Sequence, residues 1–190
     1  FRRVLFRSDP DLVRDLVGAL LKASCPIINA GQGVLWAEAT DELVEFAELT
    51  HVPVLTTLAG KSAFPENHPL ALGTRSISTT GPVEHFLQKA DLVFGIGCSF
   101  TRIHYGANMM SSKTLVQCTN DNQDFNKDYD IDHAIIGDAK LVIEQLIKEI
   151  KELISPQQSV EDQETAMEVK AVKEQWLAEW MPKLTSDEVP

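Results

Sequence analysis

Short apolar runs alternate with helix-patterned segments along most of this chain, and this alternation limits the possible folds more than any other feature. The predicted strands cover residues 26–30, 53–57, 91–97, 113–118 and 133–137. The predicted helices cover residues 10–24, 37–50 and 83–89, and a further helix capped by Asp138 runs to Leu153. Parallel strands need crossover connections, which are usually helical. The pattern predicts an α/β fold: a doubly wound, Rossmann-like parallel sheet of about five to six strands with helices on both faces.

The charge and the cysteine content of the chain exclude several classes of protein. The formal net charge is −11 and the isoelectric point is about 4.8, whereas proteins that bind nucleic acids or anionic membranes carry basic patches. No apolar run approaches the roughly 20 residues that a membrane helix needs. Cys25, Cys98 and Cys118 show no close pairing typical of a disulfide framework or a zinc site. We therefore expect a cytoplasmic protein with reduced thiols and with neither nucleic acid nor a membrane as a partner.

Three segments of different character divide the chain. Residues 1–8 begin without methionine, and residues 4–8 match one reading frame of a sequencing adaptor, which gives the hypothesis that this leader is foreign to the protein. Residues 9–154 carry the alternating pattern and form the predicted central domain. Residues 155–190 are acidic, and apolar residues at helical spacing from Val169 to Trp180 predict an exposed linker that leads into one amphipathic helix. Tryptophans on such a tail indicate packing against another surface.

A glycine-rich turn follows the first predicted strand. Gly31, Gln32 and Gly33 would let the backbone approach a phosphate at the start of a helix, but a tight structural turn needs glycine equally. Trp36 stands where the dinucleotide fingerprint G-x-G-x-x-G has its third glycine, and no acidic residue closes the next strand to bind a ribose. As a dinucleotide signature the turn is therefore weak.

No group of residues has the spacing of a catalytic site. The five histidines are scattered, and structural roles are favoured for His51, His68 and His85. Cys98 follows the third predicted strand, where a helix N-terminus could activate a thiol, but no clear helix follows and an inert thiol is favoured. The aspartates between residues 121 and 132 lack the glycine and the glutamate of a calcium loop, so a solvated loop is favoured. We predict no catalytic residue and no metal site in this chain.

One long motif points to a family. Residues 53–73 resemble the pattern P-V-x-T-T-x-x-G-K-G-x-F-P-x-x-H-P-L-x-x-G in the central domain of thiamine-diphosphate-dependent enzymes, of which acetolactate synthase is the most similar kind. The matching residues are Pro53, Val54, Thr56, Thr57, Gly60, Lys61, Phe64, Pro65, His68, Pro69, Leu70 and Gly73. Further matches are residues 90–93, Gly97 with Phe100 and Arg102, and residues 136–140. The resemblance covers residues 10–152.

The resemblance implies the architecture and the activity of a parent protein. Such enzymes consist of a pyrimidine-binding domain, a central domain and a diphosphate-binding domain, and the two outer domains hold thiamine diphosphate and magnesium. The acidic tail resembles the linker toward the diphosphate-binding domain. The chain is therefore expected to be a fragment, inactive alone, of a carboligase or decarboxylase that acts on 2-oxo acids and forms a homodimer or homotetramer.

The resemblance also implies a nucleotide site within this domain. Acetolactate synthases bind FAD across the carboxyl ends of the central strands, and other relatives hold ADP, another nucleotide or none. The candidate cofactor contacts, carried over by position, are Gly31, Gln32, Gly33, Thr57, Leu58, Gly97, Ser99, Phe100, Asn120, Asp121 and Asp138. Residues 74–77 and 99–102 depart from the family pattern beside the flavin. Lys61 and His68 are expected to be architectural or to contact the edge of a nucleotide.

A free-standing FAD- or NAD-binding module of the same broad fold is the alternative. An NAD-dependent deacylase of the sirtuin kind would need a zinc-binding cysteine quartet, and this chain has only three cysteines. The linker-like tail favours the fragment of a thiamine-diphosphate enzyme over the free-standing module.

Overall fold

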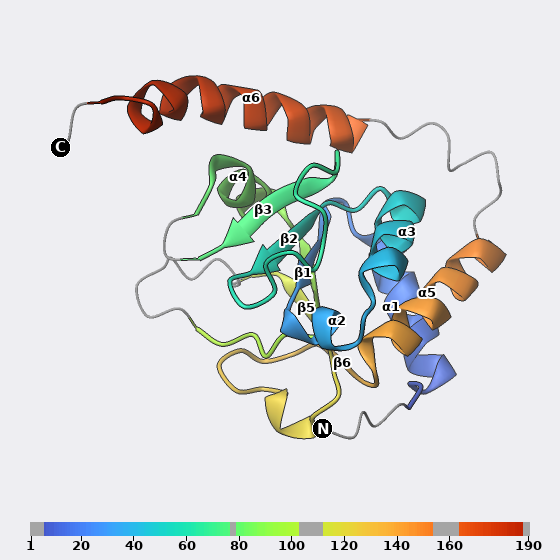
Figure 1. The fold of residues 1–190 in the computed structure, drawn as a ribbon. Helices are drawn as coiled ribbons and strands as arrows, with labels where there is room; N and C mark the ends of the chain where they lie inside the picture. Colours follow the sequence, from blue (N-terminus) through green and yellow to red (C-terminus); the bar gives the residue numbers. More distant parts are fainter. Residues whose placement is uncertain (1–5, 77–78, 103–111, 154–163, 188–190) are drawn as a thin grey trace.

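A single parallel sheet forms the centre of the molecule. The computed structural model describes residues 6–76, 79–102, 112–153 and 164–187. The six strands are β1 Pro26–Ala30, β2 Val54–Thr57, β3 Ala71–Arg75, β4 Leu92–Ile96, β5 Thr114–Thr119 and β6 His133–Ile136. All neighbours pair in parallel, in the order β3-β2-β1-β4-β5-β6 (Figure 1). The winding direction therefore reverses between β1 and β4, and open α/β sheets bind ligands outside the carboxyl ends of the strands at such a point.

Helices lie on both faces of this sheet. The helices α1 Pro10–Lys22, α3 Thr40–Thr50 and α5 Ala139–Leu153 cover one face, and α4 Gly81–Lys89 and α6 Glu164–Leu184 lie on the other (Figure 1). A short helix, α2 Gln32–Trp36, follows β1, and a 3-10 turn, η1 Asn122–Asp124, follows β5. The predicted doubly wound parallel sheet is confirmed. In the described part of the chain, no helix combines the length and the apolar character that a membrane crossing requires.

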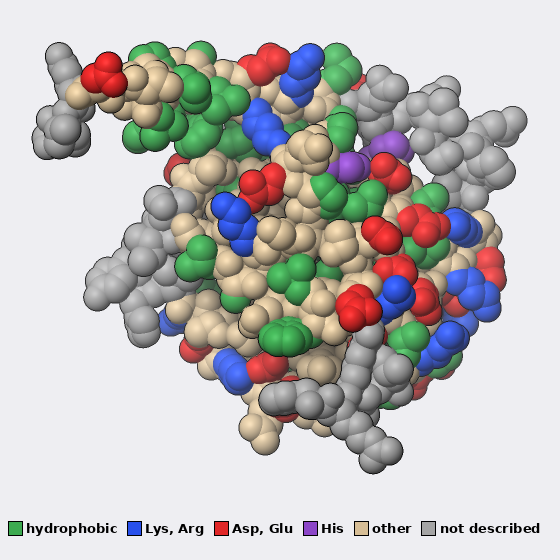
Figure 2. All heavy atoms as spheres, viewed as in Figure 1, with side chains coloured by type: hydrophobic (Ala, Val, Ile, Leu, Met, Phe, Trp, Pro, Cys, Tyr) green, Lys and Arg blue, Asp and Glu red, His purple; other side chains and the backbone are tan. Residues whose placement is uncertain are grey.

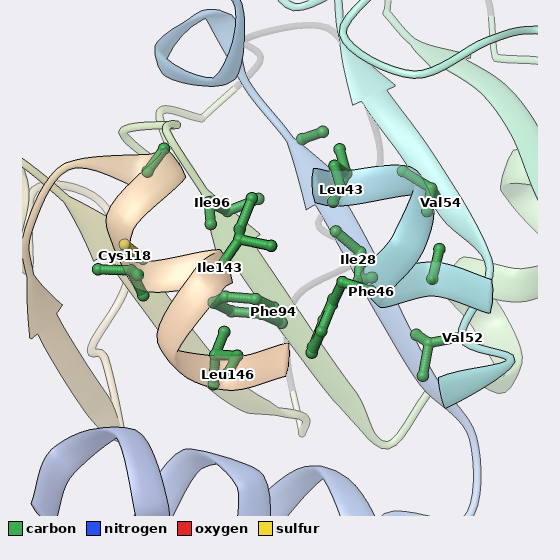
Figure 3. Close-up of a cluster of buried hydrophobic side chains, with 14 of the residues drawn as sticks. Ile28, Leu43, Phe46, Val52, Val54, Phe94, Ile96, Cys118, Ile143 and Leu146 are labelled. Atoms are coloured by element: carbon green, nitrogen blue, oxygen red, sulfur yellow. The ribbon is translucent and has the colours of Figure 1, made fainter. Parts of the chain in front are cut away.

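Buried aromatic and aliphatic side chains fasten α3 and α5 to the sheet. Phe46 from α3 and Phe94 from β4 meet edge to face, with ring centroids 6.2 Å apart and an angle of 75° between the rings (Figure 3). Ile143 and Leu146 from α5 are fully buried beside Phe94. Aromatic pairs of this geometry contribute about 0.5–1.5 kcal/mol beyond the area that they bury.

Aspartate side chains fix the starts of two helices, as the sequence predicts. The Asp9 carboxylate accepts a hydrogen bond from the backbone N–H of Asp11 at 2.9 Å, and Pro10 follows as the first helical residue. The buried carboxylate of Asp138 accepts from the N–H groups of Lys140 and Leu141 at 3.1 and 3.3 Å. Both aspartates satisfy amide groups that have no partner within the helix.

Two elements are absent from the sequence prediction. The strand β3 was missed because Gly73 interrupts it with a φ of 107° and the register with β2 shifts between Val54 and Leu55. The helix α2 is only five residues long and contains Gly33, so it has no helical periodicity that a pattern could reveal. The next helix consequently begins at Thr40, whereas the sequence indicates a start at residue 37.

The two ends of the described chain pack against this domain. Phe6 accepts a backbone hydrogen bond from Asp138 at 3.0 Å, and the N–H of Ser8 donates to the Gln145 side chain at 2.9 Å. The predicted tail helix is present as α6, which lies beside α4 (Figure 1). Trp176 lies directly on Gly81, where an added Cβ would come within 2.7 Å of the indole ring.

The Glu168 side chain links α6 to α4 through contacts with two basic residues of α4. Its carboxylate contacts His85 Nε2 at 2.8 Å and Lys89 Nζ at 2.7 Å, and the neighbouring Val169 is buried. Two hydrogen bonds lower the pKa of Glu168 below its usual value of 4.5: the bond with His85 has the larger effect and the bond with Lys89 the smaller one. Because the folded state depresses this pKa, the contact stabilises docking above about pH 4.5 and is lost as the pH falls through the folded-state pKa.

We expect Glu168→Gln to weaken the docking of α6 by about 1 kcal/mol, since it removes a partly exposed ion pair. Wild-type docking should also weaken as the pH falls from about 4.5 through the lowered folded-state pKa of Glu168, because the carboxylate then becomes protonated. The fluorescence of the tryptophans on α6, followed during urea unfolding, measures both effects. Glu174→Gln is the matched control, because Glu174 is exposed and its ion pair, with Lys170 at 3.9 Å, lies within the same helix. Equal behaviour of the two variants would contradict the role of Glu168.

Candidate functional site

A cleft of about 670 Å³ lies at the carboxyl ends of the first five strands. It opens at the switch point between β1 and β4, where the fold predicts a ligand site. Eight of the predicted contact residues line it: Gln32, Gly33, Thr57, Leu58, Gly97, Ser99, Phe100 and Asn120. The strand order thus brings together residues from four separate segments of the sequence, which lie at the carboxyl ends of β1, β2, β4 and β5.

Glycines form the part of the cleft where β1 and β4 end. The N–H of Gly31 donates to Ile96 O at 2.8 Å, and the N–H of Gly33 donates to Gly97 O at 2.9 Å. A Cβ on Gly31 would lie 2.2 Å from Gly97 O, and Gly97 has a left-handed φ of 60°. The two backbones therefore pack directly on each other, which is the tight structural turn that the sequence left open as an alternative.

A row of three residues, two carboxamides with a glycine between them, lies beneath the cleft on the central strands. Asn29 on β1, Gly95 on β4 and Gln117 on β5 stand side by side in the sheet register. Asn29 and Gln117 are 1% and 0% exposed. The Phe100 ring occupies the space above Gly95, since a Cβ there would lie 2.4 Å from the ring. Asn29 lines the cleft, whereas Gln117 donates to Cys98 O at 2.9 Å.

The rim of the cleft combines cationic, hydroxyl and apolar groups. Arg75, at the end of β3, is half-buried and forms no ion pair with the described residues. Lys127, in contrast, is paired with Asp124. Trp36 and Leu58, which line the same cleft as Arg75, are 73% and 69% exposed, so that they offer large apolar surfaces to a ligand. This combination suits a ligand that has both an anionic group and a flat apolar part.

Three of the predicted contact residues lie outside the lining of the cleft. Gly31 is covered by the Gly97 carbonyl, as described above. Asp121 is exposed and accepts from the N–H of Gln123 at 2.9 Å, so that it caps the 3-10 turn. Asp138 caps α5 beyond the end of β6. Each of these carboxylates has a structural partner in the protein, and neither faces the cleft.

The loop that carries the family motif supports the cleft from one side. Gly60 crosses the end of β1, where an added Cβ would lie 2.6 Å from Ala30 O. His68 Nδ1 accepts from the N–H of Leu70 at 3.1 Å, and its Nε2 contacts Glu48 at 3.2 Å. Lys61 faces Glu66 at 3.6 Å. These contacts are architectural, and neither Lys61 nor His68 is among the residues that line the cleft.

The described histidines, cysteines and carboxylates do not assemble a metal site: no three of these side chains converge within the described ranges. His51 closes α3 in a left-handed conformation with a φ of 53°, and His85 contacts Glu168. Another of the five histidines, His104, lies outside the described residues.

The two thiols nearest the cleft, Cys98 and Cys118, are buried. Burial raises the pKa of Cys98 to about 12, and burial also raises the pKa of Cys118. Only Cys25 is partly exposed. We expect iodoacetamide at about pH 8 to add one adduct to the native chain, because alkylation requires an accessible thiolate. Intact-mass measurement should give three adducts after unfolding, in line with the three cysteines, and a native chain with modified Cys98 would contradict this interpretation.

The fold and the cleft define an open, Rossmann-like α/β domain with a cleft at the topological switch point. The model of the family described as thiamine pyrophosphate enzyme, central domain, matches residues 13–146. The chain belongs to this family. The resemblance stated from the sequence is thereby confirmed, and a free-standing module is not favoured.

Known proteins agree with this assignment. The chain is 34% identical over 148 residues to a probable acetolactate synthase large subunit from Methanococcus aeolicus, which covers 77% of the chain and 25% of the relative. It is 34% identical over 140 residues to a 3D-(3,5/4)-trihydroxycyclohexane-1,2-dione hydrolase from Bacillus cereus, covering 73% and 22%. A crystal structure of benzoylformate decarboxylase from Polynucleobacter necessarius superposes with a TM-score of 0.64 at 25% identity, covering 78% of this chain and 28% of that one. The chain spans about a quarter of the length of the curated relatives it matches.

Proposed function

We propose that this chain is the central domain of a longer enzyme that depends on thiamine diphosphate and magnesium. Its parent would be a carboligase or decarboxylase that acts on 2-oxo acids in the cytoplasm, as a homodimer or homotetramer. The single observation that carries this proposal is the family match over residues 13–146, together with relatives about four times as long as the matched segment. In this proposal residues 9–154 form the central domain and residues 155–190 form the linker to a diphosphate-binding domain.

The chemistry of the parent would take place outside this chain. When bound, thiamine diphosphate supplies the stabilisation of carbanions that the cleavage of 2-oxo acids requires. The chain matches the central domain of the family, and burial raises the pKa of the Cys98 thiol beside the cleft. By the family resemblance, the pyrimidine-binding and diphosphate-binding domains would hold the cofactor and the magnesium, and this domain would act as a scaffold.

The cleft itself would hold a nucleotide, FAD or ADP. Arg75 offers a cation to a phosphate, the exposed ring of Trp36 offers a surface for stacking, and the buried Asn29 carboxamide offers a polar contact. The volume of about 670 Å³ falls in the usual range of small-molecule sites. Two segments that depart from the flavin-binding pattern, residues 74–76 and 99–102, contribute some of the residues that line this cleft. This departure favours ADP over FAD as the occupant.

The apolar side of α6 is the proposed contact with the following domain. Figure 2 shows hydrophobic side chains gathered around the C-terminal half of this helix. The exposed members are Leu177, Trp180, Met181 and Leu184, which follow a helical spacing. A patch of this kind marks an interaction site, and a linker helix would cover it with the domain to which it leads.

Reading the source gene on both sides of this coding region tests the proposal. We expect an upstream pyrimidine-binding domain with its activating glutamate, and a downstream diphosphate-binding domain with its Gly-Asp-Gly to Asn motif. A gene that begins and stops around this domain would overturn the assignment to a larger enzyme. The same reading tests the origin of residues 1–8, because a natural reading frame that continues through them would contradict a foreign leader.

A further inference from the structure

The buried row beneath the cleft contains two carboxamides that are only half satisfied. Asn29 Nδ2 approaches Cys98 Sγ at 3.7 Å, and Gln117 Nε2 donates to Cys98 O and Asp124 O at 2.9 and 3.3 Å. Their oxygens, Asn29 Oδ1 and Gln117 Oε1, have no hydrogen-bond partner among the described residues. A buried acceptor without a partner costs about 1–3 kcal/mol, and native proteins contain few of them.

The two residues differ in what lies next to them. Asn29 lines the cleft directly at the end of β1, beside the switch point. Gln117 does not line the cleft, and its amide nitrogen is held by two backbone carbonyls. Among the described residues, the Asn29 amide nitrogen makes its hydrogen-bond contact with the Cys98 sulfur, which is a weak acceptor. A ligand in the cleft can therefore complete the hydrogen bonds of Asn29 but not those of Gln117.

We propose that Asn29 determines the specificity of the cleft by accepting a hydrogen bond from a neutral donor group on the ligand. This inference rests on the proposed nucleotide site and adds the group that the site recognises. Two donors of an adenine nucleotide have the required chemistry: the exocyclic amine of the base and the 2′-hydroxyl of the ribose. A site built to pair with such a donor discriminates against an analogue that lacks it, because the buried acceptor is then left without a partner.

The test compares three ligands on the complete 190-residue chain by isothermal titration calorimetry. The ligands are ADP, IDP, which carries a carbonyl in place of the adenine amine, and 2′-deoxy-ADP, which lacks the ribose hydroxyl. We expect the wild-type chain to bind ADP about tenfold more tightly than one of the two analogues, the equivalent of one lost hydrogen bond. Weak IDP binding assigns the contact to the amine, and weak 2′-deoxy-ADP binding assigns it to the hydroxyl.

Two variants separate recognition from a structural role. Asn29→Leu, of similar size, should lose about tenfold in ADP affinity and should bind ADP and the discriminated analogue equally. Its thermal midpoint without ligand should not fall, because the substitution removes an unpartnered buried acceptor. Gln117→Leu is the matched control: it should lower the thermal midpoint, since it leaves two carbonyls unpaired, and should keep the ligand preference of the wild-type chain.

The outcomes have distinct meanings. If the wild-type chain binds ADP but binds all three ligands equally, or prefers IDP, the role of Asn29 as an acceptor is wrong while the nucleotide site stands. If Asn29→Leu keeps the selectivity of the wild-type chain, the same conclusion follows. If none of the three nucleotides binds the wild-type chain, the nucleotide site falls and the specificity of Asn29 falls with it. The wild-type comparison needs no variant, so that a poorly folded Asn29→Leu does not affect it.

Discussion

Replacing Gly31 by alanine is expected to lower the free energy of unfolding by more than about 4 kcal/mol. The added Cβ would lie 2.2 Å from Gly97 O and 2.5 Å from Cys98 Cβ. The first of these atoms belongs to the backbone, so no side-chain rotation relieves the contact and β1 must separate from β4. Urea unfolding followed by circular dichroism measures the loss, which appears as a lower midpoint.

Gly18→Ala is the matched control for this change. Gly18 lies within α1, and nothing comes within 4 Å of an added Cβ. Alanine should therefore raise the free energy of unfolding by about 0.5–1 kcal/mol, because it costs less backbone entropy in a helix than glycine does. If Gly31→Ala stays within about 1 kcal/mol of the wild-type chain, the direct packing of the two strand ends is wrong.

Phe94→Ala is expected to cost about 3–5 kcal/mol of stability, the usual effect of emptying an aromatic site in a core. Phe94 is 0% exposed and fills the space between α3, α5 and the sheet, where it meets Phe46 (Figure 3). Trp36→Ala is the control for the same kind of truncation, since Trp36 is 73% exposed and should change stability by less than about 0.5 kcal/mol. Similar losses in both variants, measured by urea unfolding, would contradict this account of the core.

The sequence predicts the layers of this fold well because its strands are buried on both faces. Such strands appear as apolar runs, and β1, β4 and β5 fall within one or two residues of their predicted bounds. The edge strand β3 has no comparable signal, since Gly73 stands at its centre and the register shifts beside it. Its pairing with β2 depends on tertiary contacts, and local pattern carries no information about them.

The cleft is only partly predictable for a related reason. The family motif and the strand ends indicate where a ligand site should lie, and they identify most of its backbone lining. Arg75 and Asn29 were missed because one lies on the unpredicted β3 and the other within an apolar run. A signal for Asn29 does exist: an asparagine inside a strand that is otherwise apolar must find a partner once it is buried.

The same features explain how the backbone holds this cleft open at the strand ends. Glycines at 31, 33 and 97 close the junction of β1 and β4, and the loop at Gly60 packs against it. This backbone framework holds the ends of β1 and β3, which carry Asn29 and Arg75, on either side of β2, so that both residues line the same cleft. Within the described residues the framework brings no activated nucleophile to the cleft, because burial raises the pKa of Cys98 to about 12.

Isothermal titration of the 190-residue chain with thiamine diphosphate and Mg²⁺ tests most directly the proposal that this domain does not hold the catalytic cofactor. ADP serves as the comparison ligand on the same sample. The proposed function predicts saturable heat from ADP and none from thiamine diphosphate, whose site would be formed by the outer domains. Tight, saturable binding of thiamine diphosphate to this chain would contradict the proposal that catalysis lies outside it.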